Sequence, residues 1–499
     1  MSIPYIKDSW RAGISDEYTR GVRGSFKYAY GVDINKRRDS LSCNWAMSNI
    51  ANSSVVTDLP RFAVTSVDGS TYAFGSGGKI YSIAGDPKDP VISNIYTDTN
   101  GEIRGAAEWE GSDGINYMYW ATATSIARKK MRYKSNGIDN GGFAGWTDAT
   151  INYKTLLDNH QWHTMKIANG SLVIANGNYL ATIDYDGSFN PAAMNIRPGN
   201  SVKCLEERDD YIIVGSTRDD ESEEGYIWTW IVGDASWVQK KKIPVKGVNA
   251  LIDTERLLMQ GGAEGELFYS DFQNAAPLNS IDTGGKCNPR VDILNDLALF
   301  GMHGGTNAER VGIYSYGRRM LNRPFAMNNQ FRLTRTVAGS TVGEIGAVWV
   351  ASSAIFASWL TLDGSTTEYG IDMASSSTRA TARLEGLEFT GGQPHLKKLY
   401  ETEKIICEPL PASTGISLLY KKDRNTTGGD SSAGAGWTYA KIADGTGTTY
   451  SVTDSTEAEF IVGQRAKEFE IAVELTPSGS DTPEITGMVG YINESTSKY

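Results

Sequence analysis

The fold is decided by the stretch Leu172-Val173-Ile174-Ala175-Asn176, which is followed after two residues by Tyr179-Leu180-Ala181-Thr182-Ile183. Two short runs of strand-forming residues around a turn predict a β-hairpin. The same pattern recurs along the chain: four or five strand formers, closely followed by Gly, Ser, Thr or Asn, with a second strand after most copies. Its copies begin at residues 71, 117, 172, 211, 257, 297 and 347, which places them 39 to 55 residues apart.

This spacing is close to the period of a four-stranded propeller blade, a unit too small to close a hydrophobic core alone. The sequence therefore predicts a β-propeller, and six or seven blades fit the copies equally well. The alternative is a plain run of hairpins within one large sandwich, which the period disfavours. Second strands are expected at residues 79–83, 179–183, 266–270 and 312–316.

The predicted fold class is all-β, with three parts along the chain. Residues 1–60 are predicted to form an extended N-terminal arm, because they are rich in charge and glycine and show little periodicity. The propeller is expected over residues 61–388. Gly391-Gly392 and Pro394 mark a boundary, after which residues 389–499 are predicted to form a β-sandwich.

Six strands are expected in that last part. Within one of them Phe469, Ile471, Val473 and Leu475 alternate with Glu470, Ala472 and Glu474, which predicts one buried face and one largely wet face. A loop rich in Gly and Ser is expected at residues 425–436. The strands lie near 396–409, 416–421, 437–442, 458–462, 469–475 and 485–492.

Composition agrees with many short strands and tight turns. The 499 residues include 54 Gly, 25 Tyr and 12 Trp, a mix that suits strands better than helices, in whose interior Gly is unfavourable. No apolar run is long enough to span a membrane, and the N-terminus has no secretion signal. We therefore expect a protein made in a cytoplasm and not secreted.

The formal net charge is −11, of which −5 falls after residue 388 (10 basic and 15 acidic residues). Because acidity is spread over both parts, the sequence argues against a dedicated nucleic-acid-binding domain. It remains compatible with a surface past which DNA slides without sticking.

The sequence offers little support for a metal or redox site. Cys43, Cys204, Cys287 and Cys407 are far apart and form no CxxC pair, so we expect reduced, buried thiols. The pair His160 and His163 has no third ligand at metal spacing, and a packing or surface role is expected for it. Asp184-Tyr185-Asp186-Gly187 resembles the start of a calcium loop, but a hairpin turn explains the same residues.

Runs of charged residues are expected to lie in solvent or to protect edge strands against unwanted pairing. Residues 219–224 form an acidic loop, with a cation-attracting or DNA-repelling rim as the minority interpretation. Basic clusters occur at residues 128–134, 240–242 and 318–319, where lysine can protect an edge strand or meet an acidic partner. No catalytic motif is recognisable, so we predict no enzyme activity, no catalytic residues, no metal site and no cofactor.

Three stretches together resemble virion proteins of tailed bacteriophages: residues 31–41, the blade phrases at 267–272 and 313–319, and the tail segment with 416–423, Trp437, 469–475 and 482–492. The layout is similar to that of the tail-hub or nozzle proteins of short-tailed phages, also described as packaged-DNA-stabilisation proteins. The resemblance implies a propeller with an appended sandwich, and it carries over no catalytic residue.

The same resemblance implies the partners and the place of action. Identical subunits would form a ring, a hexamer in that family, below the portal and its adaptor, near the tail fibres and around DNA that passes without specific binding. An acidic channel wall repels phosphate and would let DNA slide. We therefore expect a non-enzymatic structural protein of the phage tail, located in the virion.

Two other classes of function stay open at this point. A receptor- or glycan-binding tail protein would use aromatic platforms such as Trp120, Trp228, Trp230 and Trp359, although core packing is the commoner role of such residues. A propeller glycosidase would need acids that converge at the blade tops. The candidates for that role are Asp184, Asp253 and Asp292.

Overall fold

In the computed structural model the chain divides into two compact units. We call them the propeller unit (Ser48–Ile313 and Leu333–Met373) and the sandwich unit (Met1–Met47, Tyr314–Arg332 and Ala374–Tyr499), so that the chain crosses from one unit to the other four times. The structure describes residues 2–15, 24–35, 39–67, 69–135, 138–142, 145–146, 148–219, 224–262, 265–270, 275–279, 285–304, 310–318, 321, 323–337, 342–363, 366–389, 395–427, 429–430 and 433–494.

Almost all regular structure among these residues is strand. The one α-helix in the described ranges is a single turn, α1 (Thr334–Val337). The prediction of an all-β fold that combines a propeller with a sandwich is confirmed.

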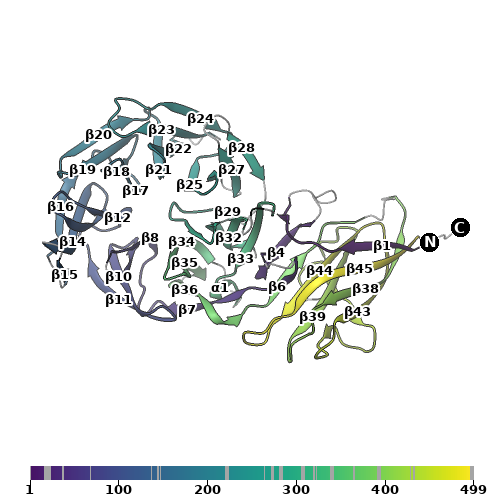
Figure 1. The fold of residues 1–499 in the computed structure, drawn as a ribbon. Coiled ribbons are helices and arrows are strands. Elements are labelled where there is room, and N and C mark those ends of the chain that lie inside the picture. The colour runs from purple at the N-terminus through teal and green to yellow at the C-terminus, as the bar shows by residue number, and fades with distance from the viewer. Residues whose placement is uncertain are drawn as a thin grey trace. The chain divides into compact units, whose positions relative to one another are not determined.

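Six separate sheets of four or five strands form the blades of the propeller unit, arranged around a common axis (Figure 1). Within each of the first five, strands pair antiparallel with strands close to them in the sequence. The first blade is made of β8 (Pro60–Thr65), β9 (Thr71–Gly75), β10 (Lys79–Asp86) and β11 (Asp89–Thr97), and the second of β12 (Gly105–Glu110), β13 (Ile115–Ala121), β14 (Ser125–Ser135), β15 (Ile138–Gly142) and β16 (Thr150–Thr155). The third is made of β17 (Met165–Ala168), β18 (Ser171–Asn176), β19 (Tyr179–Asp184) and β20 (Phe189–Asn195), and the fourth of β21 (Asn200–Arg208), β22 (Tyr211–Arg218), β23 (Gly225–Ile231) and β24 (Gln239–Ile243). The fifth is made of β25 (Val248–Asp253), β26 (Leu257–Gly261), β27 (Glu266–Ser270) and β28 (Ala275–Asn279).

The sixth blade closes the ring with a strand from near the N-terminus. Its sheet runs β34 (Val342–Ala351), β35 (Ala354–Asp363), β36 (Thr366–Arg379) and then β7 (Trp45–Ala51). Between the fifth and sixth blades lie β29 (Gly285–Lys286), β30 (Asp292–Leu294) and β31 (Leu297–Gly304), and β32 (Gly312–Gly317) then leads out of the propeller unit. Residues 289–291 in this interval line an axial cavity together with the inner strands of all six blades.

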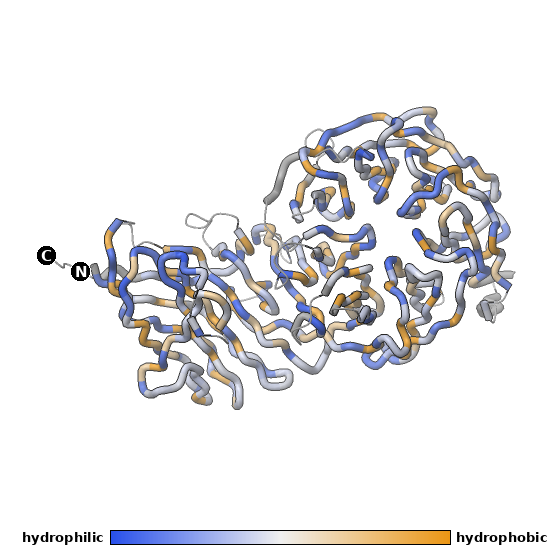
Figure 2. The backbone as a smooth tube through the Cα atoms, turned by 180° about the vertical axis from the view of Figure 1, so that it is seen from behind, coloured by the Kyte–Doolittle hydropathy of each residue, from blue (hydrophilic) through white to orange (hydrophobic). Residues whose placement is uncertain are grey.

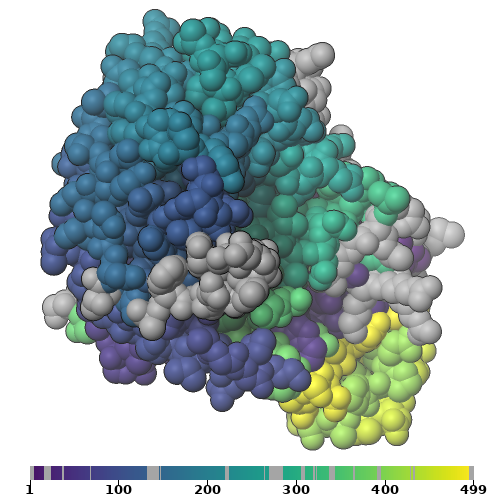
Figure 3. Space-filling view, turned by 60° about the vertical axis from the view of Figure 1, so that its left-hand side comes forward, coloured from purple at the N-terminus to yellow at the C-terminus, as the bar shows by residue number. Residues whose placement is uncertain are grey.

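The predicted repeat copies coincide with real strands. Six of them fall on the second strand of a blade or on β31, and the copy at 257–261 has the same bounds as β26. The seventh copy, at 347–351, lies on the inner strand β34 instead. Apolar faces of neighbouring blades form the cores, for example Phe74, Trp120 and Trp162 between the first and second blades. Hydrophobic and hydrophilic stretches alternate along the tube of the propeller unit in Figure 2, and Figure 3 shows the atoms of this unit packed closely together.

At two turns the structure explains why the blade strand ends in or is followed by glycine. A Cβ on Gly177 would lie 1.9 Å from the Asp158 carboxylate, and one on Gly75 would lie 2.2 Å from the Asp58 carboxylate. In both blades an aspartate from the segment before the inner strand therefore packs against the turn between the second and third strands. Only glycine leaves room for that contact.

The sandwich unit contains two sheets drawn from three separate parts of the chain. One sheet has the order β41 (Lys441–Ile442), β43 (Glu457–Ala466), β38 (Lys398–Cys407), β45 (Glu484–Glu494), β6 (Leu41–Cys43) and β5 (Val32–Asp33), with β1 (Ser2–Lys7) also on β45. In the other sheet β32 is followed by β33 (Ala326–Phe331), β4 (Tyr28–Tyr30), β37 (Ala382–Glu385), β44 (Phe469–Thr476), β39 (Gly415–Lys422) and β40 (Thr438–Tyr439), with β42 (Thr449–Tyr450) on β39. A short parallel pair joins β2 (Gly13–Ile14) to β3 (Ser25–Phe26).

Aromatic rings connect the two sheets. The ring centroid of Tyr400 on β38 lies 5.3 Å from that of Phe469 on β44, and Phe389 lies 5.6 Å from Tyr400. Phe469, Ile471, Val473 and Leu475 are buried as the alternation predicts. The expectation of a wet opposite face is wrong for Glu470 and Ala472. They are buried because Lys27 pairs with Glu470 at 3.0 Å and because Trp437 packs against Ala472.

The predicted domain boundaries need correction. Residues 1–60 are not a separate arm: β1, β4, β5 and β6 are strands of the sandwich unit, and β7 belongs to the sixth blade. The range 61–388 is not all propeller, since 314–332 and 374–388 lie in the sandwich unit. Likewise 389–499 is not a self-contained sandwich, because its β44 and β45 pair with strands from residues 2–43 and 382–385. The predicted boundary residues Gly391, Gly392 and Pro394 lie outside the described residues.

Candidate functional site

Two cavities lie along the inner strands of the propeller unit. The larger, about 510 Å³, is lined by residues of β8, β12, β17, β21, β25 and β34 and by residues 289–291. The other, about 420 Å³, lies where the inner strands of the third to fifth blades begin. It is lined by His160, Gln161, Trp162, Ser201, Lys203, Thr217, Asp219, Lys246, Asn249, Gly262 and Lys286.

A belt of polar contacts joins neighbouring blades around these cavities, and we call it the axial belt. Arg61 of the first blade is central to it. Its Nη1 lies 2.5 Å from Glu102 Oε1, in the segment before the second blade, and its Nε lies 3.2 Å from Glu344 Oε1 of the sixth. Arg104 continues the belt from Glu102 to the third blade, where its Nη1 donates to Asn159 Oδ1 at 2.6 Å.

The belt continues through the fourth and fifth blades. Lys166 Nζ lies 2.6 Å from Glu206 Oε1, and Arg208 Nη1 lies 3.2 Å from Asp253 Oδ1. Lys203 Nζ donates to Asn249 Oδ1 at 2.6 Å. In each case the charged group of one blade is partnered by the next blade. The belt therefore fixes the blades to one another, and its partly buried pairs are screened by salt less than surface pairs are.

Burial shifts several pKa values at the axis. It lowers the pKa of the Lys203 ammonium to about 8, although nearby thiols oppose the shift. Burial also lowers the pKa of His303 to about 4, and it raises the pKa of the Glu206 carboxyl against the effect of Lys166. For Glu344, burial is outweighed by the Arg61 guanidinium and the Asn288 amide, which hold its pKa below the usual value.

The acids named for a possible glycosidase do not meet in the structure. Asp184 ends β19 and accepts a hydrogen bond from Ser171 Oγ at 2.9 Å. Asp253 is paired with Arg208 in the axial belt. Asp292 is held by Arg290 at 2.8 Å and by the Val350 amide at 3.0 Å. Each has a structural partner of its own, and no contact joins any two of these three acids.

The four tryptophans named as glycan platforms are core residues. Trp120, Trp228, Trp230 and Trp359 are at most 1% exposed, and each indole Nε1 donates within its own surroundings. Trp120 bonds Asp98 at 2.6 Å, for example. The platform hypothesis is wrong for these residues, since a buried ring offers no face to a sugar.

The expected turn, thiols and histidine roles are confirmed. All four cysteines are buried and form no disulfide. His163 is fully buried between the carbonyls of Ala175 and Ala123, and burial lowers its pKa. Gly187, at φ 81°, turns the chain between β19 and β20. Among the residues that the structure describes, no three His, Cys, Asp or Glu side chains lie close enough to hold a metal ion.

The basic clusters have different positions. The one at 128–134 lies on β14, between β13 and β16, so the edge-strand interpretation is wrong for it. There the Arg128 guanidinium lies 3.8 Å from the ring centroid of Tyr153. Lys240, Lys241 and Lys242 lie on β24, the outer edge of the fourth blade, as the edge-strand interpretation expects. Arg319 and residues 220–223 of the acidic run lie outside the described residues.

Sequence reasoning missed the axial belt. Its members are Arg61, Glu102, Arg104, Asn159, Lys166, Lys203, Glu206, Arg208, Asn249, Asp253 and Glu344. A signal existed, because several blades carry a charged residue at or just before the inner strand, as Arg61 and Arg104 do. The partner of each charge lies in another blade, however, and no local pattern identifies it.

No protein-family model matches the chain, and no curated protein matches it. Similar solved structures include the WD40 β-propeller domain of Doa1 (12% identity, 66% of this chain and 97% of that one, TM-score 0.40) and YCF48 bound to D1 peptide (10%, 67% and 95%, 0.41). A third is the computationally designed Ika8 protein (9%, 66% and 99%, 0.37). In addition, no helix among the described residues is long and apolar enough to cross a membrane.

Proposed function

We propose that this protein is a non-enzymatic structural subunit of a bacteriophage tail, of the hub or nozzle kind, that assembles with identical copies around the DNA path in the virion. The observation that carries the proposal is the course of the chain. Four crossings connect the propeller unit to the sandwich unit, whereas a single linker is the usual connection between domains and leaves them mobile. Four covalent connections share a pulling force, which suits a particle component that withstands DNA pressure.

The axial belt supports the same proposal. Arginine and carboxylate groups at the propeller axis are engaged in pairs between blades, such as Arg61 with Glu344 and Arg208 with Asp253. Groups held in this way stiffen a scaffold. The sequence resemblance to tail-hub proteins supplies the proposed place, below the portal and its adaptor, and the net charge of −11 suits a wall past which DNA slides.

Particles that lack this protein test the proposal. We expect them to lose packaged DNA or to lack the distal tail in electron micrographs, and we expect the purified protein to restore both when it is added back. Complete, DNA-filled particles that fail only to adsorb to the host would contradict the structural role and favour the receptor-binding alternative.

One specific observation favours the receptor-binding alternative, namely a basic pocket on the fourth blade. Binding at this pocket would not need the buried tryptophans, and it can be tested on the isolated chain.

A further inference from the structure

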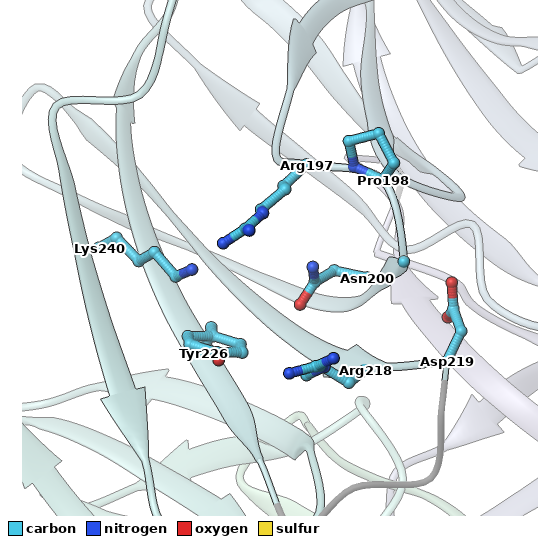
Figure 4. A pocket seen from close by; sticks show the side chains of 8 residues that line it. Arg197, Pro198, Asn200, Arg218, Asp219, Tyr226 and Lys240 are labelled. Carbon is cyan, nitrogen blue, oxygen red and sulfur yellow. The ribbon is translucent and has the colours of Figure 1, made fainter.

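The fourth blade carries a pocket of about 420 Å³ (Figure 4). One wall is the turn between β20 and β21, and the others come from the end of β22, the start of β23 and the edge strand β24. Its lining residues are Arg197, Pro198, Gly199, Asn200, Arg218, Asp219, Tyr226 and Lys240. This pocket shares no residue with the larger axial cavity, and it shares only Asp219 with the second cavity, which His160 and Lys203 line.

The charges in the pocket are unequally neutralised. Arg218 pairs with Glu224 at 3.1 Å, and Asp219 accepts a hydrogen bond from Ser201 Oγ. Arg197 and Lys240 have no ion pair with any residue in the described part of the chain. Burial lowers the pKa of Lys240, and so do the like charges of Arg197 and Arg218, while the Glu224 carboxylate opposes the shift. A bound anion would relieve that repulsion.

An aromatic ring lies beside the second cation. Lys240 Nζ lies 4.0 Å from the ring centroid of Tyr226 and 4.6 Å from that of Trp228. The Tyr226 hydroxyl donates to Glu224 Oε2 at 2.5 Å, which fixes the ring in the wall of the pocket. Lys240 is thereby held in place rather than extended into water.

Asn200 supplies an independent sign of a ligand. Asn200 is 4% exposed, and its Oδ1 is buried without a hydrogen-bond partner among the described residues. A buried polar atom without a partner is unfavourable by about 1–3 kcal/mol. Figure 4 shows the Asn200 amide directed into the pocket between Arg197 and Arg218. A hydroxyl group in the pocket would satisfy this oxygen.

We propose that this pocket binds an anionic sugar, a saccharide unit that carries a carboxylate or sulfate, with the anionic group at Arg197 and Lys240 and a hydroxyl at Asn200. The combination of two cations that have no ion pair among the described residues with a buried amide fits a ligand that has both a charge and hydroxyl groups. An acidic peptide fits less well, because an added strand would pair along the edge of β24, where Lys240 to Lys242 hinder strand addition. The inference goes beyond the proposed structural role and does not depend on it.

The test uses the full-length protein, with binding measured by isothermal titration calorimetry and by ligand-observed NMR. The probes are methyl glucuronide, the sulfated monosaccharide glucose 6-sulfate, neutral methyl glucoside, sodium acetate and sodium sulfate. We expect one of the two anionic sugars to bind at least tenfold more tightly than the neutral sugar and than either simple anion, and we expect its affinity to fall as salt is added.

Matched variants locate the site. Lys240→Ala and Lys241→Ala remove the same charge from adjacent positions of β24, but neighbouring side chains of a strand point to opposite faces. We expect Lys240→Ala and Arg197→Ala to weaken the binding at least tenfold and Lys241→Ala to leave it within twofold. Melting temperatures check that each variant is folded.

Three outcomes would overturn the inference. Equal binding of methyl glucoside would exclude an anion site, and acetate or sulfate binding as tightly as both anionic sugars would exclude a sugar site. Equal effects of Lys240→Ala and Lys241→Ala would place the binding elsewhere. None of these results bears on whether particles lacking the protein retain DNA, so the failure of this inference and that of the structural role are distinguishable.

Discussion

The two units of the chain use the same element, the β-strand, but they recruit strands over very different distances in the sequence. In the first five blades each strand pairs with strands close to it along the chain, as β9 does with β8 and β10. In the sandwich unit, Ser2 is paired with Asn493 and Tyr28 with Glu385. Closing such long loops costs entropy before the contacts are gained. The propeller unit is therefore locally encoded, and the sandwich unit depends on both ends of the chain.

The largest expected effect comes from removing residues 1–40. This deletion takes away β1, β4 and β5, and with them the buried side chains Trp10 and Phe26. We expect the sandwich unit to lose its fold, while the blades from β8 to β28 keep theirs because their partners are local. Hydrogen exchange measured by mass spectrometry separates the two units, and peptides of β38, β44 and β45 should lose protection.

A truncated chain that retains full protection in β45 would contradict this comparison. It would mean that residues 1–40 behave as the independent arm that their composition predicts. Trp10→Ala is the milder variant, with an expected loss of about 3–5 kcal/mol in the unfolding free energy of the sandwich unit.

These two units also show how much the sequence could predict. The blade strands and the strands at 398–407, 415–422, 457–466, 469–476 and 484–494 follow from short apolar runs and turns, which are local signals. The strands β1, β4 and β7 were missed because their partners lie hundreds of residues away, and a short strand of mixed composition does not indicate its partner. The same limit applies to the pocket. Lys240 belonged to a recognised basic cluster, but Arg197 and Asn200 have no local motif, and only the fold brings them together.

The next effect concerns pH, which is expected to act on the two units with opposite signs. Burial raises the pKa of Glu403, in the sandwich unit, to about 8 from an ordinary value of 4.5. The folded state then binds more protons than the unfolded state between these values, so stability falls as pH rises through this window. In the propeller unit burial lowers the pKa of His303 to about 4. Between about pH 4 and the ordinary pKa of 6.5 the unfolded state binds more protons at this histidine than the folded state does, so stability rises as the pH rises through this window.

Hydrogen exchange at pH 5, 6.5 and 8 measures this difference. We expect the sandwich unit to be destabilised between pH 6.5 and 8, by an amount on the order of a few kcal/mol, and Glu403→Gln to remove most of that change. Glu401→Gln is the matched control, because Glu401 lies on the same strand but is exposed. An unchanged pH profile in Glu403→Gln would show that Glu403 is not the responsible group.

A smaller effect separates two tryptophans of the sixth blade. Trp349 and Trp359 are both 1% exposed, but only Trp359 has a partner for its indole, Asp372 Oδ1 at 2.8 Å. Trp349 Nε1 has none in the described part of the chain. Trp359→Phe leaves the buried Asp372 carboxylate with one donor fewer, and we expect a loss of about 1–3 kcal/mol. Trp349→Phe removes an unsatisfied donor and should cost less. Urea unfolding measures both, and equal losses would refute the assigned hydrogen bond.

The smallest effect tests whether the turns of one blade are encoded by backbone conformation alone. Gly170 and Gly177, in the third blade, both have positive φ angles, 71° and 65°. A Cβ on Gly170 would meet nothing within 4 Å, but one on Gly177 would meet the Asp158 carboxylate at 1.9 Å. Gly170→Ala should cost about 1 kcal/mol, the penalty of a left-handed conformation for an L-residue. Gly177→Ala carries the same penalty and must also displace Asp158, so we expect a larger loss in urea unfolding. If the two losses are equal, the contact between Asp158 and the hairpin turn does not stabilise the blade, and the glycine after the strand signals only a turn.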